Sequence, residues 1–237
     1  MTKAIQLREV SREYQQGGEV IAALDEVSLT FQPGEFTTLY GPSGSGKTTL
    51  LNLIGGLDLP TKGEVLVGAV HMNRLSNAQR AEFRLQHVGF IFQSYNLIPV
   101  LSARENVEFV MQLQGVPADK RMERALKLLE RVGLVELANR RPDEMSGGQQ
   151  QRVAVARAIA SEPDIILADE PTANLDSKTA ASLLTLMEDL NRTRNVTFLF
   201  STHDEQVMER AKRLIRLRDG KVEDDHELRA ASADEIR

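Results

Sequence analysis

The sequence has no cysteine and no tryptophan, and only 5% of its 237 residues are aromatic. The lack of cysteine excludes a disulfide framework, a thiolate zinc site and a cysteine nucleophile, and it fits a reducing compartment. A chain of this length buries roughly 70% of the surface that it exposes when unfolded. We therefore expect a core that needs neither disulfides nor a structural metal.

A basic excess is also lacking, because 29 lysine and arginine residues stand against 34 acidic residues and the net charge is −5. Proteins dedicated to nucleic acid usually carry a basic excess or a clustered basic face, so we expect no nucleic-acid partner. Residues 1–9 lack the apolar core of a signal peptide. Residues 36–57 contain a single charge, Lys47, but glycine, serine and proline interrupt them, and the sequence therefore predicts no membrane-spanning segment.

Strands and helices alternate along most of the chain. Strands are predicted within the first 35 residues, at 36–40, 63–68, 88–92, 164–168 and 196–201, and in a closing hairpin at 214–222. Apolar spacing predicts helices after Lys47, between 97 and 145, and at 149–160, 177–191 and 205–210. This alternation predicts an α/β fold with a mostly parallel sheet. We expect one domain over 1–223 with a helical subdomain inserted at about 97–148, and a polar, loosely held tail at 224–237.

A glycine-rich motif follows the strand predicted at 36–40 and precedes a helix. It has the form G-x-x-x-x-G-K-[ST] and consists of Gly41, Pro42, Ser43, Gly44, Ser45, Gly46, Lys47 and Thr48, with Thr49 directly after it. The glycines let successive backbone N–H groups point at one anion, and the helix N-terminus adds its dipole. Lys47 is expected to reach the β- and γ-phosphates, and the Thr48 hydroxyl to take a Mg²⁺ position. The motif thus favours a phosphate site over a chance Gly/Ser-rich turn.

Two acidic residues, Asp169 and Glu170, end the apolar strand predicted at 164–168. A carboxylate at such a strand end holds Mg²⁺ directly or through water. The adjacent carboxylate points the other way along the pleat and polarises an attacking water. An Asp-Glu pair is also typical of an ordinary solvated strand end. The phosphate motif favours the catalytic interpretation, with Asp169 as metal ligand and Glu170 as the group that acts on water.

A short segment before the helix predicted at 149–160 resembles the LSGGQ signature of ATP-binding cassette (ABC) ATPases. It reads Met145-Ser146-Gly147-Gly148-Gln149, with methionine in place of leucine. The resemblance extends over residues 7–222 and implies a P-loop ABC ATPase core, an N-terminal antiparallel β subdomain and the inserted helical subdomain. It also implies ATP and Mg²⁺ as cofactors. The signature precedes a helix, so it is a second anion site with free amides.

The same resemblance assigns roles to four other positions. Tyr14 lies where the family places an aromatic ring under adenine, although an ordinary half-buried strand tyrosine has the same pattern. Gln93 matches the glutamine that contacts Mg²⁺ or the attacking water. His203 matches the switch histidine that contacts the γ-phosphate. Asp176 ends a segment, residues 173–176, that resembles the D-loop lying across the dimer seam of relatives.

The resemblance further implies protein partners. In this family the two anion sites meet only between two subunits packed head-to-tail, which implies a dimer of two copies with shared ATP sites. Segments 55–64, 89–99 and 105–107 are similar to lipoprotein-releasing and macrolide-exporting ATPases (LolD/MacB type). Because no membrane-spanning segment is predicted here, the resemblance implies that this chain drives an integral membrane permease, which is a separate polypeptide, from the cytoplasmic face of the inner membrane. An FtsE-like ATPase, which regulates a cell-envelope process without moving cargo, is the alternative.

Residues 95–101 form a proline-containing, poorly periodic stretch whose apolar members are Tyr95, Leu97, Ile98, Val100 and Leu101. We expect this stretch to form the groove that receives a permease helix, with Phe83 and Val107 lining the same groove. Alternatively, they pack the base of the helical subdomain. Two other functions remain open but are disfavoured. A soluble ABC ATPase of DNA repair or translation usually carries a long coiled-coil insertion or two cassettes. A small-molecule kinase with the same phosphate loop has no need of the signature or His203.

Overall fold

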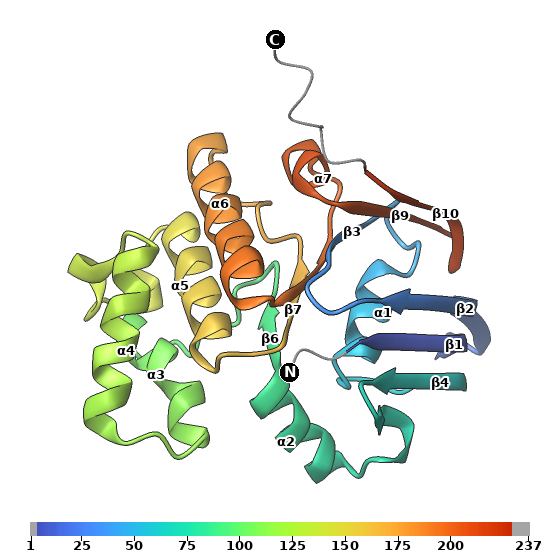
Figure 1. Cartoon of the computed structure of the whole chain (residues 1–237), viewed down its shortest axis with the longest axis horizontal. Helices are drawn as coiled ribbons and strands as arrows, with labels where there is room; N and C mark the ends of the chain where they lie inside the picture. Colours follow the sequence, from blue (N-terminus) through green and yellow to red (C-terminus); the bar gives the residue numbers. More distant parts are fainter. Residues whose placement is uncertain (1–3, 229–237) are drawn as a thin grey trace.

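The computed structural model describes residues 4–228, which form two sheets (Figure 1). The first sheet is antiparallel throughout, with the order β2-β1-β4-β5. Its strands are β1 (Ile5–Gln16), β2 (Glu19–Phe31), β4 (Lys62–Val67) and β5 (Val70–His71). This sheet is the expected N-terminal antiparallel part of the fold.

The second sheet has the order β10-β9-β3-β8-β7-β6 and is parallel except for the hairpin of β9 and β10. Its strands are β3 (Phe36–Tyr40), β6 (Val88–Ile91), β7 (Ile165–Asp169), β8 (Thr197–Ser201), β9 (Arg213–Arg218) and β10 (Lys221–Glu227). The predicted α/β fold with a mostly parallel sheet is confirmed.

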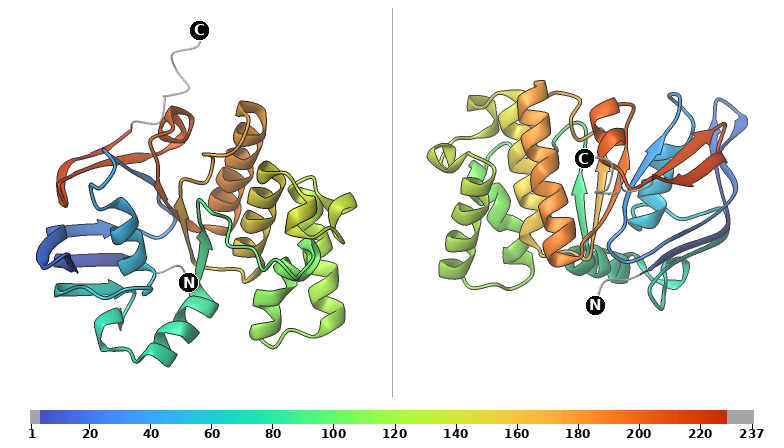
Figure 2. Two further views of the ribbon diagram at one scale, coloured as in Figure 1. Left: turned by 180° about the vertical axis from the view of Figure 1, so that it is seen from behind. Right: turned by 45° about the horizontal axis from the view of Figure 1, so that its top comes forward.

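The α-helices are α1 (Lys47–Ile54), α2 (Asn77–His87), α3 (Ala103–Leu113), α4 (Ala118–Arg131), α5 (Gly147–Ala160), α6 (Ser177–Arg194) and α7 (Glu205–Arg210). Four of them, α3 to α6, lie together on one side of the molecule, whereas α1, α2 and α7 lie outside this group. Figures 1 and 2 show α3, α4, α5 and α6 on the side opposite β1, β2 and β4, with the strands of the second sheet between them. Within residues 4–228, no helix combines the length and the apolar character needed to cross a membrane.

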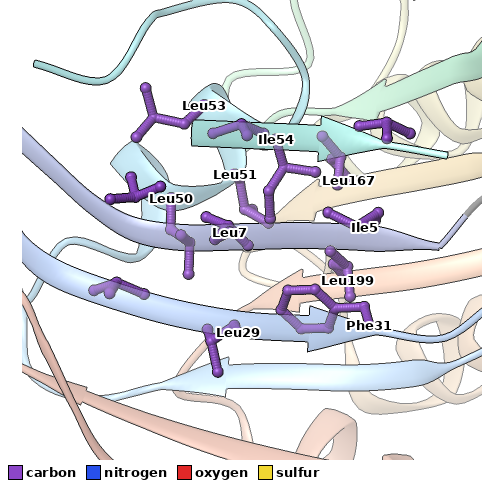
Figure 3. Close-up of a cluster of buried hydrophobic side chains, with 14 of the residues drawn as sticks. Ile5, Leu7, Leu29, Phe31, Leu50, Leu51, Leu53, Ile54, Leu167 and Leu199 are labelled. Carbon is purple, nitrogen blue, oxygen red and sulfur yellow. The ribbon is translucent and has the colours of Figure 1, made fainter. Parts of the chain in front are cut away.

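Helix α1 is packed between the two sheets, and this position fixes the loop that precedes it. Its buried residues Leu50, Leu51, Leu53 and Ile54 join one hydrophobic cluster with side chains from both sheets. From the first sheet come Ile5, Leu7, Leu29 and Phe31, and from the second Leu167 and Leu199 (Figure 3). Because each of these side chains loses its contact with water, the cluster contributes strongly to the stability of the fold.

Two further hydrophobic clusters build the rest of the molecule. One packs α5 and α6 against the second sheet and contains the tilted rings of Phe36, Phe198 and Phe200. The other joins α3, α4 and α5 and includes Val107 and Leu129, both fully buried. Helix α5 belongs to both clusters, so it connects the helical group to the sheet.

Helix α2 was not expected from the sequence. Its residues are mostly polar, and Phe83 is its single buried side chain among those the structure describes. A capping box starts the helix, because the Ser76 hydroxyl accepts from the Gln79 N–H while the Gln79 side chain accepts from the Ser76 N–H. The Ser-x-x-Gln pattern was therefore the available signal for this helix.

Two other expectations are corrected. The tail was predicted to start at Asp224, but β10 continues to Glu227, which pairs with Arg213 in the backbone ladder to β9; residues 229–237 lie outside the described part. Phe83 and Val107 do not line one groove, because both are buried in different hydrophobic clusters. The predicted division into one domain with an insertion at 97–148 stays a prediction, with α3 and α4 inside that range.

Candidate nucleotide site

The glycine-rich segment forms the loop between β3 and α1. Lys47 Nζ donates hydrogen bonds to the carbonyl oxygens of Gly41 (2.8 Å) and Pro42 (2.9 Å), so its ammonium group lies within the loop. Gly46 has a φ of 101°, and a Cβ there would lie 2.4 Å from the carbonyl oxygen of Ala23. This turn therefore requires glycine. Together the loop presents a cation and the N-terminus of α1 to an anion.

An acidic edge faces this cation from the end of β7. The Thr48 hydroxyl donates to Asp169 Oδ2 at 2.9 Å, which joins the phosphate loop to the strand end. Burial lowers the pKa of Lys47, and the negative charges of Glu170 and Asp169 act in the opposite direction. Within the described residues, no cluster of three or more His, Asp or Glu side chains is arranged to hold a metal. A hydroxyl and one carboxylate nevertheless fit Mg²⁺, which takes its other oxygens from phosphates and water.

Glu170 sits directly after this strand in a left-handed backbone conformation, with φ 47°. Its Oε2 accepts from the Thr202 hydroxyl at 2.9 Å, and its Oε1 lies 2.8 Å from His203 Nδ1. The Thr202 hydroxyl in turn accepts from the backbone N–H of Asp204. The Glu170 N–H donates to the carbonyl of Ser201, so β8 anchors the backbone of this residue as well. Both carboxylate oxygens thus have a partner and a fixed orientation.

These groups line one open cavity of about 760 Å³. Its lining contains Tyr14, Gly41 to Thr49, Gln93, Asp169, Glu170 and His203, together with Ala23 and Ser201. Every residue expected from the phosphate motif and from the acidic pair is therefore brought together. Ala23 and Ser201 were not foreseen: Ser201 is adjacent to the segment of His203, whereas an alanine within a strand carries no signal that sequence reasoning detects.

Gln93 enters the cavity from the loop that follows β6. Its carbonyl oxygen lies 3.4 Å from Asn174 Nδ2, which comes from the segment after β7. The next turn contains Tyr95 and Asn96, both with positive φ. Arg157 of α5 donates to both of their carbonyl oxygens. The loop of Gln93 is thus attached to the same helix that begins with the signature.

The signature residues Ser146, Gly147, Gly148 and Gln149 do not line this cavity. Ser146 is the N-cap of α5, where its hydroxyl accepts from the Gln149 N–H and the Gln149 side chain accepts from the Ser146 N–H. Asp176 also lies outside the cavity, as N-cap of α6. Hydrogen bonds from the Thr179 side chain and from the Thr179 and Lys178 N–H groups lower the pKa of Asp176. Five predicted cofactor-binding residues are therefore apart from the rest of the site within one copy.

Comparisons with known proteins identify the family of this chain. The family model of ABC transporters matches residues 24–173, which include the phosphate loop, the signature and the acidic pair. An uncharacterized ABC transporter ATP-binding protein of Methanocaldococcus jannaschii, MJ0796, is 46% identical over 229 residues, covering 95% of this chain and 97% of that protein. The lipoprotein-releasing system ATP-binding protein LolD 1 of Rhodopseudomonas palustris is 46% identical, covering 94% of this chain and 99% of that protein.

A longer relative and two solved structures support the same family. The macrolide export ATP-binding/permease protein MacB of Hyphomonas neptunium is 46% identical over 98% of this chain, which spans 36% of that protein. A dimeric structure of MJ0796 in a post-hydrolysis state with ADP and phosphate has a TM-score of 0.92 at 44% identity, over 95% of this chain and 99% of the solved one. A second dimeric structure of that cassette matches equally well. The family, the fold and the cavity agree, and the chain belongs to the ABC transporter family as a nucleotide-binding cassette.

Proposed function

We propose that this protein is the ATP-hydrolysing subunit that drives a separate membrane permease of the lipoprotein-release or macrolide-export type. The observation that carries the proposal is the single cavity in which the Lys47 ammonium faces the Asp169 and Glu170 carboxylates. That arrangement binds a triphosphate at one end and acts on water at the other.

Binding rests on the loop Gly41–Thr49, whose Lys47 exchanges its two carbonyl partners for phosphate oxygens. Thr48, Asp169 and Gln93 are the proposed holders of Mg²⁺, with the remaining positions left to phosphate and water. When bound, Mg²⁺ neutralises charge on the β- and γ-phosphates. Tyr14 is the proposed platform for the adenine ring, since it lines the same cavity.

Hydrolysis is assigned to Glu170, which orients and polarises the attacking water. His203 lies against the same carboxylate and is exposed toward solvent, with 80% of its side chain accessible. This exposure leaves the imidazole free to contact a γ-phosphate, while Thr202 keeps the carboxylate in place from the buried side.

The site is proposed to be complete only in a head-to-tail dimer. Ser146 to Gln149 and Asp176 lie outside the cavity of their own chain, and the amides at the N-terminus of α5 form an anion site with no phosphate loop beside it. A second copy supplies these residues across the seam. Both solved structures of the relative MJ0796 are dimeric, which supports this assembly.

The permease is proposed to contact the segment from Tyr95 to Leu101 at the cytoplasmic face of the inner membrane. Val100 supports this, because 72% of its surface is exposed although it is apolar. Leu97 instead packs against the cluster of α3, α4 and α5. The names of the relatives, LolD and MacB, favour transport over the FtsE-like alternative.

The test is the variant Glu170→Gln, which keeps the shape of the side chain and removes its charge. We expect ATP to bind normally, phosphate release to fall by about 100-fold or more, and gel filtration with ATP and Mg²⁺ to show a trapped dimer. A variant that stays monomeric with ATP contradicts the dimer. A variant that hydrolyses at the normal rate contradicts the role of Glu170.

A further inference from the structure

Tyr14 is held by two neighbours that no part of the proposed hydrolysis uses. Its hydroxyl donates to Asp58 Oδ2 at 2.8 Å, and Arg12 Nε donates to the same oxygen at 2.9 Å. The Arg12 guanidinium carbon lies 4.5 Å from the centre of the Tyr14 ring, over its face. The ring is therefore fixed at its hydroxyl end by a carboxylate and at one face by a cation.

The opposite face of the ring is the one that remains for a ligand. Tyr14 lines the nucleotide cavity, whereas Arg12 and Asp58 do not. A guanidinium over one face of a ring excludes a planar ligand from that side, so a base can stack only from the side of the cavity. This one-sided support gives a partly exposed ring a fixed orientation.

Asp58 also connects the platform to the phosphate loop. It follows α1, and the N–H groups of Leu57 and Asp58 both donate to the carbonyl of Asn52 within that helix. The Leu59 N–H donates to Asp58 Oδ1, which fixes the carboxylate itself. Helix α1 begins at Lys47 and has eight residues, or about 12 Å of length. The phosphate end and the base end of the cavity are therefore attached to opposite ends of one short, buried helix.

We infer that Arg12 and Asp58 are positioning residues that hold the Tyr14 ring as a stacking platform for the nucleobase, at a spacing from the phosphate loop set by α1. The inference rests on the proposed ATP binding and adds to it the residues that determine the contribution of the base. Arg12 and Asp58 should affect only the part of the affinity that comes from the base, because neither residue touches the phosphate loop or the acidic edge.

The experiment compares ligands with and without a base. The dissociation constants of ATP and of inorganic tripolyphosphate are measured by calorimetry, with Mg²⁺, on the full chain and on Asp58→Ala. Loss of part of the base stacking on the Tyr14 ring should raise the ATP dissociation constant by roughly three- to tenfold. The constant for tripolyphosphate should not change. The matched control is Asp25→Ala, which removes an exposed acid of β2 paired with Lys221 and should alter neither constant.

A double-variant cycle shows whether Asp58 acts through the ring. In a Tyr14→Ala background, Asp58→Ala should have no further effect on ATP affinity, because the platform is already gone. Arg12→Met, which keeps the Tyr14–Asp58 hydrogen bond, provides a milder second variant and should weaken ATP in the same direction.

Three results overturn the inference: equal losses for ATP and tripolyphosphate, unchanged ATP affinity in both Asp58→Ala and Arg12→Met, or additive losses in the cycle. Failure of the unmodified chain to bind ATP contradicts the proposed function instead, and the two failures are thus distinguishable.

Discussion

The hydroxyl hydrogen of Thr202 has only one direction available. The Asp204 N–H can only donate, so it occupies an acceptor position of Thr202 Oγ1 and leaves the hydroxyl hydrogen to Glu170 Oε2. Thr202 is fully buried, and its own N–H donates to the carbonyl of Leu39. The buried Thr202 thereby fixes the orientation of the Glu170 carboxylate, which is the group proposed to act on water.

Replacing Thr202 by valine should therefore affect turnover and not binding. Valine has nearly the same shape but cannot donate, so the Glu170 carboxylate loses its anchor. We expect kcat for ATP hydrolysis to fall by roughly 10- to 100-fold with little change in KM. Steady-state phosphate release at several ATP concentrations measures both constants.

Thr202→Ser is the matched control, because it restores the hydroxyl and should recover most of the rate. A rise in KM together with the fall in kcat, or no rescue by serine, would mean that Thr202 serves only to pack the chain at the end of β8.

At the scale of elements, one arginine adds side-chain contacts to the backbone pairing that joins β10 to β9. Arg213 of β9 donates through Nε and Nη2 to both oxygens of Asp225 at 2.7 Å, and its Nη1 contacts Glu35 at 3.0 Å. It also lies over the ring of Phe31. These contacts hold the polar end of β10, which was predicted from the sequence to be part of the tail.

Arg213→Met should lower the free energy of unfolding by about 1–3 kcal/mol, since it leaves Asp225 and Glu35 without their shared partner. Urea unfolding followed by circular dichroism measures this change, and hydrogen exchange should show faster exchange of the β10 amides. Arg218→Met is the control, because its pair with Glu223 is exposed and should contribute less than about 1 kcal/mol. Equal effects of both variants would contradict the anchoring role.

The sequence indicated most elements because their signals are local. The loop before α1 has its whole geometry encoded in adjacent residues, and the buried strands β7 and β8 are short apolar runs. Helix α2 was not predicted, because only one of its residues, Phe83, is buried and the amphipathic pattern is therefore weak. The last residues of β10 were not predicted as strand, because the ion pair of Asp225 with Arg213 of β9 holds them and they have no apolar pattern.

For the whole molecule, the important fact is the separation of the signature from the cavity. Ser146 opens α5, in the helical group opposite the first sheet (Figures 1 and 2). We therefore propose that its hydroxyl and the free amides at the helix N-terminus bind an anion held by the phosphate loop of a second copy.

A change at Ser146 should accordingly affect assembly and leave the isolated copy intact. Ser146→Asp keeps a good N-cap for α5 but adds a negative charge where a partner's γ-phosphate is expected. In the Glu170→Gln background, we expect normal ATP affinity and loss of the ATP-dependent dimer in gel filtration. Ser146→Asn, a neutral N-cap of the same size, should still allow the dimer. If Ser146→Asp dimerises as well as Ser146→Asn, the signature does not meet a phosphate.

The site residues that belong to one contiguous motif were predictable from the sequence. Those that only folding brings together were not. Lys47 and Thr48 were found from a contiguous motif, and Asp169 and Glu170 from their place after a strand. Arg12 and Asp58 were not found, because they are 46 positions apart and meet only when β1 and the loop after α1 are packed together. Ala23 likewise reaches the cavity only through the pairing of β1 and β2.

The two carbonyl partners of Lys47 have a consequence for the end of each cycle. The carbonyl oxygens of Gly41 and Pro42 already hold the ammonium group, so the proposed binding of a phosphate exchanges these acceptors for phosphate oxygens, and its release restores them. On this proposal, release of the product leaves no unpaired positive charge on Lys47. The backbone carbonyls thus compete with phosphate for Lys47 and lower the affinity of the loop for phosphate. A lower affinity favours release of the product after each turnover.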